Sequence, residues 1–192
     1  WLDGLRARLE EYRGLGARFA KWRAVIAIDE ANALPSDYCI EANAHALARY
    51  AALSIEQGLV PIVEPEVLMD GDHSIDACFE ATQRTLRRVF ATLAEHRIEL
   101  RQILLKPNMV ISGKDCPDQA GPEEVARKTI DCFLRVIPAD LPGIVFLSGG
   151  QSDLEATENL NSMNKVGSFP WELSFSYGRA LQTTTLAAWS GR

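Results

Sequence analysis

Apolar and polar positions along this chain alternate between stretches with a period near 3.6 residues and short, continuous apolar runs. The periodic stretches predict helices over residues 3–17, 38–57, 75–96, 122–136 and 179–189, with a further helix beginning after Ser152. The apolar runs predict strands over residues 19–28, 59–63, 102–105, 143–147 and 173–176. Strands and helices therefore follow one another in turn along the whole sequence.

Local signals mark several of these helix ends. Gly58 is suited to stop the second helix, because glycine readily adopts the left-handed conformation that follows a helix. Pro122 is a favoured first helical residue. Ser152 and Glu155 have the spacing of a capping box, which begins a helix. One face of the helix over 75–96 is expected to be buried, formed by Cys78, Leu86, Val89, Phe90 and Leu93.

Short apolar strands that alternate with amphipathic helices predict a parallel sheet covered by helices, either an open doubly wound sheet or a closed (β/α)8 barrel. We expect one polar residue to close each strand: Lys21, Glu64, Lys106, Ser148 and Ser176. The spacing, roughly 42 positions for three steps and roughly 28 for the last, favours the barrel. The early glycine-rich turn of an open nucleotide-binding sheet is absent. Residues 1–192 are expected to form a single partial TIM-barrel domain with about five of the eight βα units.

Composition narrows the class of protein. Hydrophobic residues make up 47% of the chain and charged residues 24%, which is typical of a globular domain. The net charge of −6 disfavours nucleic acid as a partner. No apolar run is long enough to span a membrane, and the first residues read as a charged amphipathic helix rather than a signal peptide. Four widely separated cysteines favour free thiols in a reducing cytosol, so we expect a cytoplasmic protein.

Lys106 ends an apolar run and precedes Pro107. Proline favours extended geometry in the residue before it and donates no hydrogen bond to a sheet, so strand pairing is expected to stop there. A lysine held near apolar walls or a second cation has a lowered pKa and can attack a carbonyl as the free amine. The alternative is a lysine that extends into solvent from the end of the sheet.

Glu64 repeats this arrangement, because it precedes Pro65 and is followed by Glu66. Two carboxylates two positions apart in an extended segment face the same side, where each raises the pKa of the other and one can hold a proton for acid–base chemistry. The alternative is a solvated acidic loop.

Lys21 and Arg23 are also two positions apart, and they form either a cationic wall or an ordinary charged surface. Hydrophobicity alone would begin this strand at Ala24, which would leave Lys21 before it.

Two glycine-containing segments follow the last two strands. Ser148, Gly149 and Gly150 precede one helix, and Ser176, Gly178 and Arg179 precede another. Backbone N–H groups in such turns, together with a helix N-terminus, favour an anion. Loops after the last two strands of a barrel often bind phosphate, and the two segments together therefore predict a phosphate site.

No metal site is expected. Asp70, Asp72 and His73 resemble a ligand cluster, but His45 and His96 lie on predicted helices without a partner one turn away. A zinc site needs three or four ligands in fixed geometry. We interpret residues 70–73 as a loop.

Five segments, taken in order, resemble the class I fructose-bisphosphate aldolases. They are residues 19–23 (FAKWR), 63–66 (VEPE), 105–110 (LKPNMV), 146–152 (FLSGGQS) and 175–182 (FSYGRALQ), and the similarity extends over essentially the whole chain. The resemblance implies strands four to eight, from helix three to helix eight, of an aldolase barrel.

The resemblance also implies residue roles. Lys106 corresponds to the lysine that forms a Schiff base, Glu64 to the general acid–base residue, and Glu66 to its carboxylate neighbour. Lys21 corresponds to a further active-site lysine on a strand that begins before Ala24, and Arg23 to a residue that contacts substrate. The positions that match the phosphate site are Ser148, Gly149, Ser176, Gly178 and Arg179.

The implied reaction is the reversible cleavage of fructose 1,6-bisphosphate to dihydroxyacetone phosphate and glyceraldehyde 3-phosphate in glycolysis and gluconeogenesis, without metal or organic cofactor. The implied assembly is a homo-tetramer.

The family takes an aspartate from the first strand, a lysine from the third and a tyrosine from a C-terminal tail, and none of these positions exists in this sequence. We therefore expect a fragment of a longer protein that is weakly active or inactive alone. The alternatives are a non-catalytic remnant that acts as a binding or scaffold module, and a transaldolase-like Schiff-base enzyme.

Overall fold

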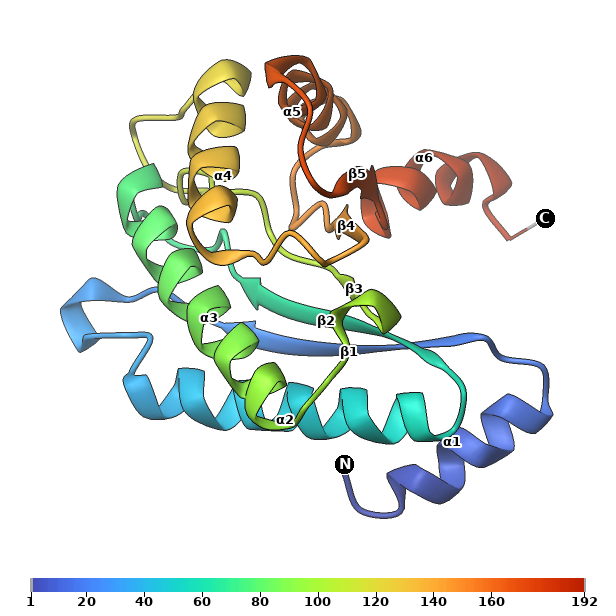
Figure 1. Ribbon diagram of the computed structural model, residues 1–192. Coiled ribbons are helices and arrows are strands. Elements are labelled where there is room, and N and C mark those ends of the chain that lie inside the picture. Colours follow the sequence, from blue (N-terminus) through green and yellow to red (C-terminus); the bar gives the residue numbers. More distant parts are fainter. Residues whose placement is uncertain (1, 192) are drawn as a thin grey trace.

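A computed structural model describes residues 2–191 as a parallel β-sheet with helices between successive strands (Figure 1). The strands are β1 (Phe19–Ile26), β2 (Val60–Val67), β3 (Leu104–Leu105), β4 (Gly143–Phe146) and β5 (Glu172–Phe175). The helices are α1 (Leu5–Gly14), α2 (Asp37–Glu56), α3 (Ile75–Glu95), α4 (Pro122–Val136), α5 (Asp153–Val166) and α6 (Arg179–Trp189). Short 3₁₀ turns lie at Glu30–Asn32 and Leu100–Gln102. The strands pair in chain order, and every pairing is parallel, which confirms the predicted class of fold.

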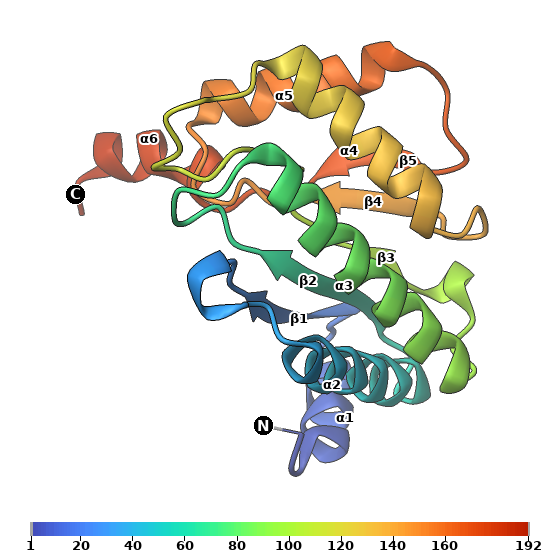
Figure 2. The same cartoon turned by 90° about the vertical axis from the view of Figure 1, so that its left-hand side faces the viewer.

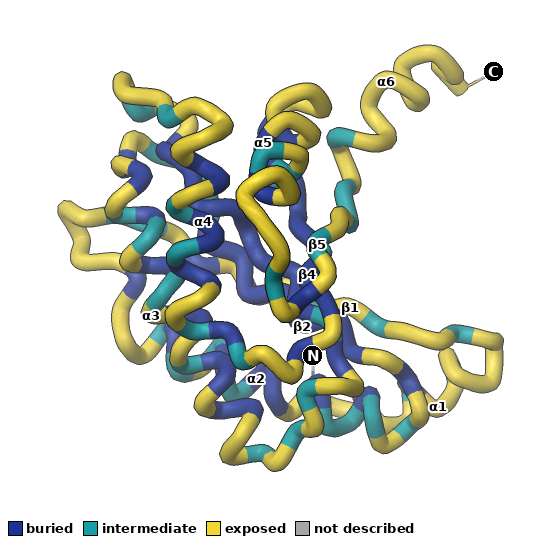
Figure 3. The backbone as a smooth tube through the Cα atoms, turned by 45° about the horizontal axis from the view of Figure 1, so that its top comes forward, coloured by how far each residue is buried: buried dark blue, intermediate teal, exposed yellow. Residues whose placement is uncertain are grey.

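Helices α2 to α5 lie along one side of the sheet (Figures 1 and 2). Helix α1 packs against α2 through Leu5, Leu9 and Tyr50. Helix α6 extends away from the sheet and is exposed along its length, as Figure 3 shows. No described helix combines the length and the apolar character needed to cross a membrane.

The helix ends have the predicted signals. Ser152 accepts a hydrogen bond from the backbone N–H of Glu155, and the Glu155 side chain accepts one from the backbone N–H of Ser152, so the capping box is present. Pro122 is the first residue of α4. Gly58 follows α2 with φ of 72°, a conformation that side chains disfavour. The N-terminus of α2 is capped by Ser36, whose hydroxyl accepts from the N–H of Cys39 at 3.1 Å.

The main core lies between the sheet and α2 to α5. The five predicted face residues of α3 are all buried in it: Cys78, Leu86, Val89, Phe90 and Leu93. Phe146 of β4 stacks on Phe133 of α4, with ring centroids 5.7 Å apart. Burial raises the pKa of the Cys78 and Cys132 thiols, so these cysteines act as small apolar residues of the core.

The two faces of the sheet differ in chemistry. In β1, Ala24 and Ile26 are buried toward the helices, whereas Lys21 and Arg23 lie on the opposite face. Arg23 is paired in register with Glu64 of β2, and paired residues of neighbouring strands share a face. The helix-free face of the sheet therefore carries charged side chains.

Two strand boundaries differ from the prediction that Lys21 and Glu64 close their strands. Lys21 is the third of eight residues in β1, and Glu64 is the fifth of eight in β2. The β1–β2 pairing continues past Pro65 to Val67, because a proline interrupts hydrogen bonding only on the side that its missing N–H would face. Lys106 and Ser148 do follow the ends of their strands, as predicted.

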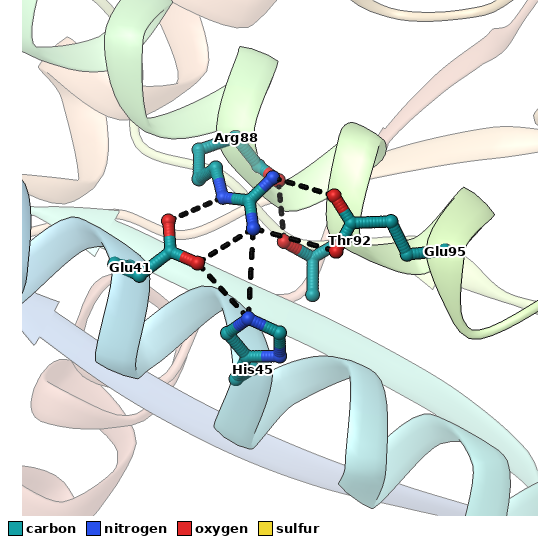
Figure 4. Close-up of polar contacts among 5 residues, drawn as sticks. All are labelled: Glu41, His45, Arg88, Thr92 and Glu95. Carbon is teal, nitrogen blue, oxygen red and sulfur yellow. Dashed lines mark hydrogen bonds and ion pairs between the residues drawn. The ribbon is translucent and has the colours of Figure 1, made fainter.

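A surface ion network joins α2 to α3 (Figure 4). The Arg88 guanidinium donates to both carboxylate oxygens of Glu41 on α2 and, at 2.8 Å, to Glu95 on α3. His45 Nε2 lies 2.9 Å from Glu41. The pKa of Glu41 and that of Glu95 are lowered, in each case chiefly by hydrogen bonding from Arg88.

We expect the stabilising effect of Arg88 to depend on pH. A carboxyl group with a lowered folded-state pKa stabilises the fold above its unfolded pKa, and this contribution disappears as the pH falls through the folded value. The difference in urea midpoint between the parent chain and Arg88→Gln is therefore expected at pH 7 and should vanish well below the ordinary glutamate pKa of 4.5. Arg87→Gln, at an exposed position on the same helix, is the control for lost charge. A midpoint difference that stays constant with pH would contradict this account.

Candidate active site

Lys106 lies directly after β3. Its backbone N–H donates to the carbonyl of Val63 at 2.8 Å, and the pairing with β2 ends before Pro107, as predicted. On the other side, the carbonyl of Pro107 still accepts from the N–H of Leu147 at 3.2 Å. Its side chain is only 10% exposed, and Nζ lies 3.2 Å from Oε1 of Glu64. The alternative of a solvent-extended lysine is therefore wrong.

Glu64 is the centre of a three-strand ion cluster. Its Oε1 faces Nζ of Lys106, and its Oε2 accepts a hydrogen bond from Nζ of Lys21. Lys21 comes from β1, Glu64 from β2 and Lys106 from the end of β3, so successive strands each contribute one group. Glu64 is 3% exposed. A carboxylate shielded from water interacts strongly with nearby charges and is well placed to pass a proton to or from either amine.

Glu66 has a separate partner. Its Oε2 accepts from Nε of Arg23, and this hydrogen bond is the main cause of the raised pKa of Arg23. The sequence predicted that Glu64 and Glu66 would act on each other as a carboxylate pair. The structure instead gives each carboxylate its own cationic partner from β1, since Lys21 and Arg23 lie on the same face as the two glutamates.

The two predicted phosphate segments lie next to each other. Gly149 and Gly150 have φ of 61° and 93°, a backbone conformation that L-residues disfavour, so glycine is required at this turn. A Cβ on Gly150 would lie 3.5 Å from the guanidinium of Arg179 and 3.3 Å from Sδ of Met69. The loop after β4 (the β4 loop, residues 147–152) therefore lies beside both the start of α6 and the segment that follows β2.

The second segment is attached to the sheet and to α5. The N–H of Ser176 donates to the carbonyl of Phe146 at 2.9 Å, which continues the β4–β5 ladder. The hydroxyl of Tyr177 donates to the carbonyl of Ala156 at 2.7 Å. Burial raises the pKa of Tyr177 to about 12, so it remains a hydrogen-bond donor near neutral pH. Gly178 is the N-cap residue of α6 with negative φ, and its backbone does not require glycine.

Two buried amides that the sequence did not single out hold the β4 loop. Gln151 donates to the carbonyl of Ser148 at 2.8 Å and accepts from Asn159 of α5 at 2.7 Å. Both side chains also line a cavity of about 180 Å³ together with Met69 and Ser112. A buried amide network of this kind fixes the backbone of a loop, and no local sequence pattern reports it.

The segment at residues 70–73 is attached to the loop after β3. The N–H of Gly113 donates to the carbonyl of His73, and a Cβ on Gly113 would lie 2.4 Å from the carbonyl oxygen of Gly71. The ring nitrogens of His73 face the backbone carbonyls of Leu68 and Ser74. Within residues 2–191, no group of three or more His, Cys, Asp or Glu side chains could hold a metal ion.

Comparisons with known proteins find matches over the whole chain. The family model for the glycolytic class-I fructose-bisphosphate aldolases matches residues 1–192. A probable fructose-bisphosphate aldolase class 1 from Xanthomonas campestris is 63% identical over 98% of this chain, and a fructose-bisphosphate aldolase from Dictyostelium discoideum is 54% identical over 99% of it. The solved fructose-bisphosphate aldolase from Plasmodium falciparum, in complex with TRAP and a small-molecule inhibitor, has 51% identity and a TM-score of 0.98 over 100% of this chain.

The match covers a limited part of each relative. This chain spans 56% of the Xanthomonas protein, 53% of the Dictyostelium protein and 55% of the solved Plasmodium chain. The five-stranded sheet therefore corresponds to part of an aldolase barrel, which confirms the predicted partial (β/α)8 fold.

Proposed function

The chain belongs to the class-I fructose-bisphosphate aldolase family, and we propose that it supplies the Schiff-base machinery for reversible cleavage of fructose 1,6-bisphosphate. The observation that carries the proposal is the contact between Lys106 and Glu64, a buried amine 3.2 Å from a buried carboxylate. Lys106 is the nucleophile, Glu64 the acid–base residue, and Lys21 and Glu66 are further charged groups of the same catalytic cluster.

The first half of the reaction forms an imine. The neutral amine of Lys106 adds to the C2 carbonyl of the ketose to give a carbinolamine. Glu64 then protonates the carbinolamine hydroxyl, water leaves, and a cationic imine remains. Both steps need a proton donor and acceptor within hydrogen-bond reach of the reacting nitrogen, and the Glu64 carboxylate meets this requirement.

The second half breaks the carbon–carbon bond. A base removes the proton of the C4 hydroxyl, the C3–C4 bonding electrons move to the imine nitrogen, and glyceraldehyde 3-phosphate leaves. The enamine that remains takes up a proton at carbon, and addition of water releases dihydroxyacetone phosphate and the amine. The imine itself is the electron sink, so the proposed reaction uses no metal or organic cofactor.

The substrate phosphate is assigned to the two loops that meet at Gly150. Backbone N–H groups at Ser148, Gly149 and Gly150, the N-terminus of α6 near Ser176 and Gly178, and the guanidinium of Arg179 would favour a dianion there. Arg23 is proposed to contact the substrate from β1. The nearness of Gly150 to the Arg179 guanidinium supports this assignment, because it brings both loops to one place.

By family resemblance, we also propose a cytoplasmic homo-tetramer that takes part in glycolysis and gluconeogenesis and acts on a sugar bisphosphate. Its proposed partners include neither nucleic acid nor membrane. The chain spans only part of its relatives, so we expect weak or no cleavage by this polypeptide alone. Imine formation is expected to persist, since the residues assigned to it all lie in this chain.

Trapping of the imine tests the proposal. The chain is incubated with dihydroxyacetone phosphate and borohydride, which reduces an imine to a stable secondary amine, and the adduct is mapped by mass spectrometry. We expect one adduct, on Lys106. Lys165 is the internal reference, because it is exposed on α5 and reports ordinary amine reactivity. A folded chain without an adduct on Lys106, or with equal labelling of both lysines, would instead support a non-catalytic binding module.

A further inference from the structure

The hydrogen-bond ladder between β2 and β3 is interrupted beside the reacting groups. The last backbone bond runs from the N–H of Lys106 to the carbonyl of Val63. Beyond it, Pro65 and Pro107 have no N–H to donate. Backbone groups of a strand point to the same side at every second residue, so the N–H of Val67 faces β3 at a level where β3 has ended.

The side chain of Asn108 takes the place of the missing ladder acceptor. Its Oδ1 accepts from the N–H of Val67 at 3.0 Å. Its Nδ2 donates at 3.0 Å to the hydroxyl of Thr82 on α3 and at 3.0 Å to the carbonyl of Met109. Asn108 is 3% exposed and Thr82 is 1% exposed, so water does not compete for these bonds.

The orientation of this amide is fixed by its partners. A backbone carbonyl can only accept and a backbone N–H can only donate. A flipped Asn108 would place its NH₂ against the N–H of Val67 and its oxygen against the carbonyl of Met109. Both contacts would be repulsive, and the burial of the site makes an unsatisfied polar group costly. Asn108 therefore has a single arrangement in this site.

The bridge encloses the reacting pair between two cross-links. The bond between Lys106 and Val63 lies on one side of Glu64, and the bond between Asn108 and Val67 lies on the other. We propose that Asn108 is a positioning residue that sets the distance between the Lys106 amine and the Glu64 carboxylate across the interrupted ladder. This inference rests on the proposed function, because it assigns a purpose to that distance.

The test measures the rate of the borohydride-trapped Lys106 adduct at a series of dihydroxyacetone phosphate concentrations. Asn108→Ala is expected to lower the maximal rate by about tenfold to a hundredfold, since a misplacement on the order of 1 Å is sufficient for such a loss. The concentration that gives half the maximal rate should change by less than about twofold, because the proposed phosphate loops are untouched.

The matched control is Thr92→Val, which removes another buried side-chain hydrogen bond on α3, from Thr92 to the carbonyl of Arg88 at 2.9 Å. Its adduct rate should equal that of the parent chain even where its urea midpoint is lower. Equal slowing by both variants, or an unchanged rate in Asn108→Ala, would overturn the proposal.

Asn108→Asp keeps the inference testable if the alanine variant does not fold. The neutral carboxyl group can accept from Val67 and donate to Thr82 or Met109, as the amide does, whereas the ionised group can only accept. The adduct rate relative to the parent should therefore approach one at low pH and fall as the introduced carboxyl group ionises. A ratio that does not change with pH would overturn the proposal.

The experiment distinguishes failure of the inference from failure of the proposed function. A parent chain that gives no Lys106 adduct would defeat the proposed function, and the inference with it. A reactive parent chain with unaffected variants would defeat the inference alone.

Discussion

Replacing Lys106 by arginine is expected to abolish the trapped adduct at this position. The overall rate of imine formation should fall by roughly 10⁴-fold or more, the scale of losing a nucleophile. Arginine keeps the positive charge beside Glu64, but its guanidinium stays protonated and cannot add to a carbonyl. The fold should therefore survive with its ion pair, which circular dichroism and the urea midpoint can check.

Lys165→Arg is the matched control, since Lys165 lies exposed on α5. It should form the adduct at the parent rate. Persistence of the adduct in Lys106→Arg, at any other lysine and with the parent rate, would show that Lys106 is not the nucleophile. The description of the fold would still hold, but the proposed role of Lys106 as the nucleophile would be refuted.

Replacing Glu64 by glutamine is expected to affect both activity and stability. Loss of a positioned acid–base group lowers a rate by about 10² to 10⁴-fold. The amide also leaves the 10%-exposed side chain of Lys106 without its counter-charge, so the free energy of unfolding should fall by about 3 kcal/mol at neutral pH. The contribution of Lys21 to this loss is smaller, because its side chain is 38% exposed.

Adduct kinetics and urea unfolding of the same Glu64→Gln sample separate the two effects. Glu10→Gln, an exposed substitution on α1, is the control for the removed charge and should match the parent in both measurements. An adduct rate equal to the parent's in Glu64→Gln would mean that another group handles the protons. A large loss of rate without a loss of stability would mean that the Lys106–Glu64 pair is looser than the 3.2 Å contact implies.

The fold could be predicted from the sequence because its signals are local. Each helix has its own periodicity and end residues, such as Pro122 for α4 and the Ser152–Glu155 box for α5. The apolar strands are buried on the helix side, and burial produces the pattern that periodicity detects. The start of β1 is the exception. Its first five residues include Lys21 and Arg23, which lie on the helix-free face, so hydrophobicity alone places the strand too late.

The candidate site was only partly accessible to sequence reasoning. Residue type and the neighbouring prolines pointed to Lys106 and Glu64, because both effects act over one or two positions. The partners of the two glutamates depend on the register between β1 and β2, which the sequence does not give. The role of Asn108 depends on which backbone N–H the prolines leave without an acceptor. This arrangement depends on how β2, β3 and α3 are placed relative to one another, which no local sequence pattern reports.

The shortness of β3 has a consequence for how firmly the two sides of the sheet are joined. Only Leu104 and Leu105 belong to this strand, whereas β1 and β2 are paired from Phe19 to Ile26. Few backbone pairs therefore join β1 and β2, which carry the two glutamates, to β4 and β5, which precede the proposed phosphate loops. The apolar core shared by α2 to α5 spans this narrow part of the sheet, so the spacing between the glutamates and those loops depends on side-chain packing as well as on the strand ladder.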